Sequence, residues 1–158
     1  CMVGYPIIQT LSGHGSVSRG ICDIKDGKLN RIVERTHIET DGTSIWYKEN
    51  NTEFRLVGTE IVSMNLMGFS SAIFPLLEDL LTKFFTEQIE VTNSHQLSAE
   101  CYIPEALQSC IERDVLVPVF ESNSAWFGVT YPNDGPIVRN RLRKLVHKGD
   151  YPTPLWTV

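Results

Sequence analysis

The stretch Ile-Val-Ser-Met-Asn-Leu-Met-Gly-Phe at residues 61–69 decides the fold, because it predicts a buried strand. Its apolar and β-branched residues form a short run, and Gly68-Phe69 closes the run before a helix begins. Asn65 is its one strongly polar side chain, and it lies toward the carboxyl end, where ligands collect in open α/β sheets. A buried amide must be hydrogen-bonded, so Asn65 is either a satisfied structural residue or a ligand-binding one.

The sequence predicts a helix after this strand and a hairpin before it. A helix is predicted at residues 72–88, with a cap at Ser70 or Ser71 and an apolar stripe: Ile73, Leu76, Leu77, Leu80, Leu81 and Phe84. Upstream, residues 20–25 and 29–35 predict a hairpin around Asp26-Gly27, a strong signal for a two-residue turn. A simple register brings Gly20, which opens the first strand, close to Glu34 at the end of the second.

The rest of the chain alternates between strands and helices. Strands are predicted at residues 2–8, 44–48, 53–56, 115–120 and 125–130, helices at 104–113 and 136–148, and polar loops at 10–18 and 90–99. This pattern predicts an α/β domain with a mixed sheet, helices and antiparallel hairpins. The tail is rich in proline, and we expect Trp156 to pack onto the domain.

Composition limits the classes of function. The chain has 158 residues, of which 42% are hydrophobic and 21% charged, as in a globular protein of one domain. A net charge of −5 argues against nucleic-acid binding. One run near the end is basic, and it is read as a solvated helix face, with phosphate binding as the alternative: Arg139, Arg141, Arg143, Lys144, His147 and Lys148.

Neither a membrane nor a structural metal is expected. No apolar run approaches the length that spans a bilayer. The four cysteines and four histidines show no metal-ligand spacing, so a zinc site is not expected and the cysteines are read as reduced. We therefore expect a cytoplasmic protein.

Four segments in order resemble the second half of bacterial sugar-phosphate nucleotidyltransferases. They are Ser18-Arg19-Gly20-Ile21, Ile32-Val33-Glu34-Arg35, Val62-Ser63-Met64-Asn65-Leu66-Met67-Gly68-Phe69 and Trp126-Phe127-Gly128-Val129-Thr130. The similar enzymes are glucose-1-phosphate thymidylyltransferases and uridylyltransferases. The resemblance implies a Rossmann-like nucleotide-diphospho-sugar transferase fold. It also implies transfer of a nucleotidyl group from an NTP to a sugar 1-phosphate, with Mg²⁺, giving NDP-sugar and pyrophosphate.

The resemblance also assigns roles to individual residues. It implies that Gly20, Glu34 and Asn65 bind the sugar, and that Arg35 binds phosphate where the family usually has lysine. These residue types suit the task, since a hydroxyl can donate to a carboxylate and accept from an amide. Each residue also has a purely structural alternative: Gly20 as the first residue of the hairpin, Glu34 as a surface residue, and Asn65 as a residue whose amide is hydrogen-bonded within the protein. Gly128 stands where many members carry a magnesium-binding aspartate. Either the metal is held differently, with help from Thr130 or Asp134, or the metal ligands lie in the other half of the enzyme.

The nucleotide-binding segments of that family lie upstream of the part that matches. We therefore expect residues 1–158 to be the C-terminal, sugar-binding portion of one nucleotidyltransferase domain, without the N-terminal nucleotide-binding portion. Transfer needs metal and cations around the phosphates, so the catalytic residues would lie in that other portion and this piece would be inactive alone. One alternative is a non-catalytic carbohydrate- or partner-binding module. Another is a structural role with self-association through an exposed sheet edge.

Overall fold

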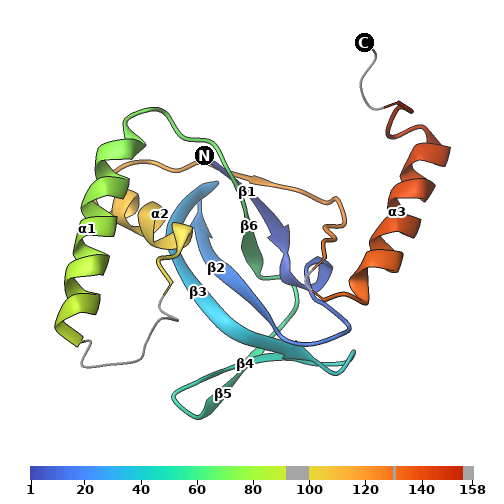
Figure 1. Ribbon diagram of the computed structural model, residues 1–158, viewed down its shortest axis with the longest axis horizontal. Coiled ribbons are helices and arrows are strands. Elements are labelled where there is room, and N and C mark those ends of the chain that lie inside the picture. The colour runs from blue at the N-terminus through green and yellow to red at the C-terminus, as the bar shows by residue number, and fades with distance from the viewer. Residues whose placement is uncertain (92–99, 130, 155–158) are drawn as a thin grey trace.

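The computed structural model describes residues 1–91, 100–129 and 131–154, and it is an α/β structure with a mixed, curled sheet (Figure 1). The strands are β1 (Met2–Pro6), β2 (Val17–Lys25), β3 (Lys28–Thr40), β4 (Ile45–Glu49), β5 (Thr52–Leu56), β6 (Ile61–Met67) and β7 (Val119–Glu121). A short 3₁₀ helix, η1 (Ile7–Gln9), follows β1, and the α-helices are α1 (Ile73–Val91), α2 (Ile103–Glu112) and α3 (Asp134–Lys148).

The predicted strand at residues 61–69 is β6, and it lies inside the sheet, between β2 and β1. The strand order is β5-β4-β3-β2-β6-β1-β7, and β6 pairs antiparallel with both β1 and β2. The pairing of β1 with β7 is parallel. The sheet curls so far that the start of β7 meets the turn between β2 and β3. There, Leu29 N donates to Val117 O at 2.9 Å, and Val119 N donates to Gly27 O at 2.9 Å. The edge of β7 is therefore bridged near its start.

Both predicted hairpins are confirmed. Asp26 and Gly27 have φ values of 51° and 71°, as a type I′ turn between β2 and β3 requires. Asn50 and Asn51, at 49° and 62°, make the equivalent turn between β4 and β5. β3 runs to Thr40, beyond the predicted end at residue 35, so the first hairpin is longer than expected.

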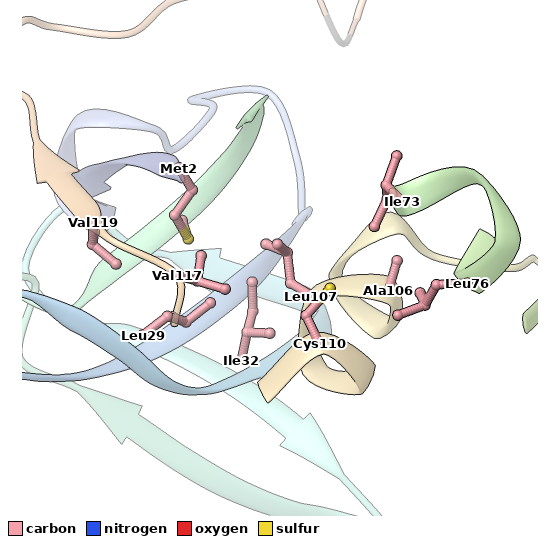
Figure 2. Packing of buried hydrophobic residues seen from close by; sticks show 10 residues of the cluster. All are labelled: Met2, Leu29, Ile32, Ile73, Leu76, Ala106, Leu107, Cys110, Val117 and Val119. Atoms are coloured by element: carbon pink, nitrogen blue, oxygen red, sulfur yellow. The ribbon is translucent and has the colours of Figure 1, made fainter. Parts of the chain in front are cut away.

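The core forms two clusters on opposite faces of the curled sheet. The larger lies between the sheet and the helices, where Ile32 on β3 and Leu107 on α2 pack together (Figure 2). Its other buried members are Met2, Leu29, Ile73, Leu76, Ala106, Cys110, Val117 and Val119. The smaller contains Ile7, Val17, Ile38, Ile45 and Val62. α2 lies between the sheet and α1, while α3 stands at the other end of the molecule (Figure 1).

One predicted strand is absent, two others are shorter than predicted, and the apolar stripe of α1 is only partly buried. Residues 125–129 form no strand, because the chain folds back so that a Cβ on Gly128 would lie 2.5 Å from the ring of Trp126. Only residues 119–121 of the strand expected at 115–120 are extended into the sheet, and strand 2–8 ends at Pro6. The α1 stripe buries Ile73 and Leu76, but Leu81 is 45% exposed because α1 packs on α2 rather than on the sheet.

No helix in the part of the chain that the structure describes has the length and apolarity needed to cross a bilayer. The four cysteines are free thiols. Trp156 and Thr130 lie outside the described residues.

Candidate functional site

The structure brings Gly20 and Glu34 side by side. They are directly paired across β2 and β3, and Gly20 is in turn paired with Ser63 on β6. Paired residues point to the same face of a sheet, so Glu34, Gly20 and Ser63 form a row across three strands. A Cβ on Gly20 would lie 3.3 Å from Glu34 Oε2 and 3.1 Å from Ile32 Cδ1. The missing side chain of Gly20 is therefore what lets the Glu34 carboxylate lie over the strand.

Asn65 lies next to this row, in a bulge rather than in the buried strand that we expected. The register between β1 and β6 shifts between Met2–Met67 and Gly4–Ser63, so β6 carries extra residues there. Asn65 has φ 57°, a left-handed conformation that asparagine tolerates better than most residues. Its backbone N–H donates to Ser63 Oγ at 3.2 Å, and its side chain is exposed. The bulge thus turns the Asn65 amide outward beside Ser63.

Glu34 lies in an environment that disfavours its charge. Burial raises the pKa of the Glu34 carboxyl, and the positive charge of Arg19 lowers it by less. A hydrogen bond with Glu100 and burial raise the pKa of Tyr102, the residue that precedes α2, and the negative charge of Glu34 adds a smaller contribution. The carboxylate is thus half-buried, near a cation on β2 and near the N-terminal end of α2.

Cys22 lies on the same face as Gly20 and Glu34. Burial, with a smaller contribution from the negative charge of Glu34, raises the pKa of the Cys22 thiol to about 12, against the opposing effect of a backbone hydrogen bond at Ser63. A thiol with this pKa is protonated at neutral pH, so Cys22 is a poor nucleophile.

Arg35 is not brought together with Glu34. Consecutive residues of a strand point to opposite faces, and the Arg35 side chain lies over the Tyr47 ring, 4.9 Å from its centroid. Arg35 Nη1 also forms an ion pair with Glu49 Oε1 on β4. In this arrangement the Arg35 guanidinium fastens β4 to β3.

A cavity of about 410 Å³ is lined by residues 8–14, residues 125–128, α3 and Arg19. Arg19 directly precedes Gly20 on β2, so its side chain lies on the opposite face of the strand from the row. Its guanidinium lies 5.4 Å from the Trp126 ring centroid, and its Nε donates to Thr10 Oγ1 at 3.1 Å. The Gln9 Oε1 atom in this wall is buried and has no hydrogen-bond partner among the residues that the structure describes. Glu34, Gly20 and Asn65 do not line the cavity.

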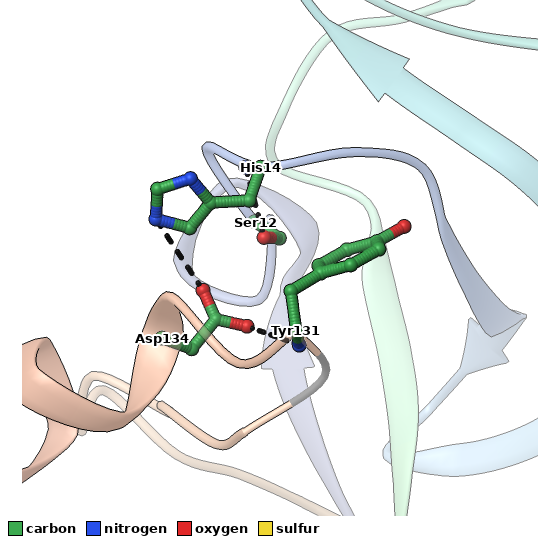
Figure 3. A network of polar contacts seen from close by, with 4 residues as sticks. All are labelled: Ser12, His14, Tyr131 and Asp134. Carbon is green, nitrogen blue, oxygen red and sulfur yellow. Dashed lines mark hydrogen bonds and ion pairs between the residues drawn. The ribbon is translucent and has the colours of Figure 1, made fainter.

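A polar network fastens α3 to the loop at residues 10–16 (Figure 3). Asp134 Oδ2 accepts a hydrogen bond from Tyr131 N at 2.8 Å, and Asp134 Oδ1 lies 3.7 Å from His14 Nε2. Tyr131 Oη donates to Ser16 O at 2.8 Å. The carboxylate of Asp134, one of the two expected metal ligands, is therefore engaged in holding the helix.

The residues present do not fit a magnesium ion. Within the described ranges, no group of three or more His, Cys, Asp or Glu side chains could hold a metal ion. Gly128 offers no side-chain ligand atom, and Trp126 fills the space beside it.

Sequence reasoning did not identify Ser63 and Tyr102 as neighbours of Glu34. Ser63 gave a usable signal, since it lies two residues before Asn65 in the same strand. Tyr102 gave none, because only the packing of α2 on β3 brings it near.

Comparison with known proteins adds no relative: no family model matches the sequence, and no curated protein matches it.

Proposed function

We propose that this chain is the sugar-binding portion of a nucleotidyltransferase domain that joins a nucleotidyl group from an NTP to a sugar 1-phosphate. The observation that carries the proposal is the pairing of Gly20 with Glu34, with the outward-turned Asn65 two residues beyond Ser63. The resemblance of the four segments is further support, and the Rossmann-like fold that it implies is part of the proposal.

The three side chains suit the hydroxyl groups of a hexose. The Glu34 carboxylate accepts hydrogen bonds from hydroxyls, and the Asn65 amide can donate and accept. Gly20 keeps the backbone accessible beside that carboxylate. Hydrogen bonds to a charged group contribute about 1.5–3 kcal/mol each, so the loss of the Glu34 charge should weaken binding strongly.

We propose magnesium as a cofactor of the complete enzyme, and not of this portion alone. The described residues of this chain do not form a site for it. The reaction's catalytic residues are expected in the nucleotide-binding portion. The isolated chain should therefore release no pyrophosphate from NTP and glucose 1-phosphate.

A titration followed by amide NMR tests the proposal on the isolated chain. Glucose 1-phosphate should shift the amide resonances of Gly20, Glu34 and Asn65 in a saturable way, while inorganic phosphate should not. Saturable shifts confined to other residues, or none up to tens of millimolar, would contradict a sugar site here.

The alternative is a non-catalytic carbohydrate- or partner-binding module, which Gly128 favours because it lacks a metal-ligand side chain. A form that includes the nucleotide-binding portion distinguishes the two. Pyrophosphate release with any hexose 1-phosphate supports the enzyme, and sugar and nucleotide binding without turnover supports the module.

A further inference from the structure

The helix α1 has an apolar face that nothing in the described structure covers. Phe74, Leu81 and Phe85 lie on one side of the helix, because Leu81 follows Phe74 by about two turns and Phe85 follows Leu81 by about one. Their side chains are 68%, 45% and 59% exposed, respectively. The side that packs on α2 is a different one, centred on Ile73 and Leu76. A helix that is apolar on two sides is usually buried on both.

One acidic residue lies on this face, whereas Asp79 and Glu87 lie on other sides of the helix, where they pair with Arg113 and Lys83. Glu78 lies exposed between Phe74 and Leu81 on the same side of the helix. α1 as a whole has four acidic residues and one lysine, which gives a net charge of −3, and α2 adds Glu105 and Glu112. The helical end of the molecule is therefore acidic.

The helix α3 has the opposite character. It contains five Lys and Arg residues and one Asp, so its net charge is +4, whereas the whole chain carries −5 and the remainder therefore −9. Arg139, Leu142, Arg143 and Val146 follow the i, i+3, i+4, i+7 spacing of one helix face. On that face the two arginines are exposed and Leu142 is 45% exposed.

We propose that a second copy of this chain covers the α1 face by laying its own α3 across it. The two faces match in both properties, since each presents apolar side chains, and the α1 face carries Glu78 where the α3 face carries Arg139 and Arg143. The aromatic side chains of Phe74 and Phe85 provide the anchors.

The placement of the two helices allows a closed dimer. α1 and α3 lie at opposite ends of the long axis of the molecule (Figure 1). A two-fold axis between two copies placed side by side brings each α3 to the partner's α1, so the same contact forms twice. This surface is distinct from the β7 edge, which the chain itself bridges near its start.

Analytical ultracentrifugation of the 158-residue chain, over a range of concentrations and salt, tests the proposal. The expected result is a reversible monomer–dimer equilibrium whose dissociation constant rises at least tenfold from low to high salt, because the contact pairs opposite charges. The double variant Arg139→Glu with Arg143→Glu should be monomeric. The matched control, Lys48→Glu with Arg55→Glu, changes net charge equally on the β4–β5 hairpin and should dimerise like the unchanged chain.

A charge exchange completes the test. The variant Glu78→Lys with Thr82→Lys makes the α1 face basic, and it should also be monomeric alone. Mixed with the acidic α3 variant it should form a heterodimer, because both contacts of the pair then join opposite charges. A chain that stays monomeric at every concentration overturns the proposal, and so does a dimer that neither variant weakens or a mixture that does not associate.

Discussion

Gly20 and Glu34 face each other across the β2–β3 ladder, and a Cβ on Gly20 would stand 3.3 Å from Glu34 Oε2. The absence of one side chain therefore sets the position of the carboxylate on which the proposed sugar site depends.

The substitution Gly20→Ala should reduce the free energy of sugar binding by more than it reduces the free energy of unfolding. The new Cβ must displace Glu34 Oε2 or Ile32 Cδ1 by a few tenths of an ångström. We expect a cost of about 1 kcal/mol in the free energy of unfolding, at the low end for overpacking, and about a tenfold loss of glucose 1-phosphate affinity. Thermal denaturation and calorimetric titration measure the two. Gly135→Ala is the control, because its Cβ would meet nothing within 4 Å.

Glu34→Gln should raise the thermal stability of the unliganded chain at neutral pH. Burial raises the pKa of Glu34 in the folded state, so the unfolded chain loses this proton first as pH rises. The free energy of unfolding of the unchanged protein therefore falls between the ordinary carboxyl pKa and the raised one. The advantage of the variant should shrink toward about pH 4, where both side chains are neutral. An equal difference in melting temperature at both pH values would contradict a raised pKa.

Cys22 should resist alkylation while Cys1 reacts. The pKa of Cys22 is raised to about 12 by burial, so almost no thiolate is present near pH 8, and Cys1 is exposed. Mass spectrometry after timed treatment with iodoacetamide should show Cys1 modified at least ten times faster. Equal rates would mean that the face carrying Gly20 and Glu34 is open to the reagent.

Arg35 is the predicted phosphate ligand that the fold places apart from Glu34. If it binds phosphate, Arg35→Gln should reduce affinity for glucose 1-phosphate about tenfold and leave affinity for free glucose unchanged. Glu49→Gln, which removes the ion-pair partner, should not reduce either affinity. Equal losses for both sugars in both variants would assign Arg35 the role of fastening β4 alone.

Local signals predicted the parts of the fold that depend on local physics. Asp26-Gly27 specified its hairpin because both residues tolerate positive φ, and the apolar run at residues 61–67 specified the strand β6. The pairing of Gly20 with Glu34 followed from that turn and a near-regular register.

Long-range packing decided what sequence reasoning missed. Residues 125–129 have the composition of a strand, but Trp126 lies against Arg19, which is more than a hundred positions away in the chain. The apolar spacing of α1 could not show that α2 would lie between this helix and the sheet, which leaves Leu81 exposed. The bulge at Asn65 also depends on how β1 pairs with β6. The sequence could therefore place Asn65 on the strand, but it could not show that its side chain is exposed.

Calorimetric titration of glucose 1-phosphate into three forms of the chain tests the central claim most directly. The unchanged chain should bind saturably, Glu34→Gln should lose at least tenfold in affinity, and Glu39→Gln, an exposed glutamate farther along β3, should bind like the unchanged chain. Equal affinity in all three forms, or no binding by the unchanged chain, would contradict a sugar site built on Glu34.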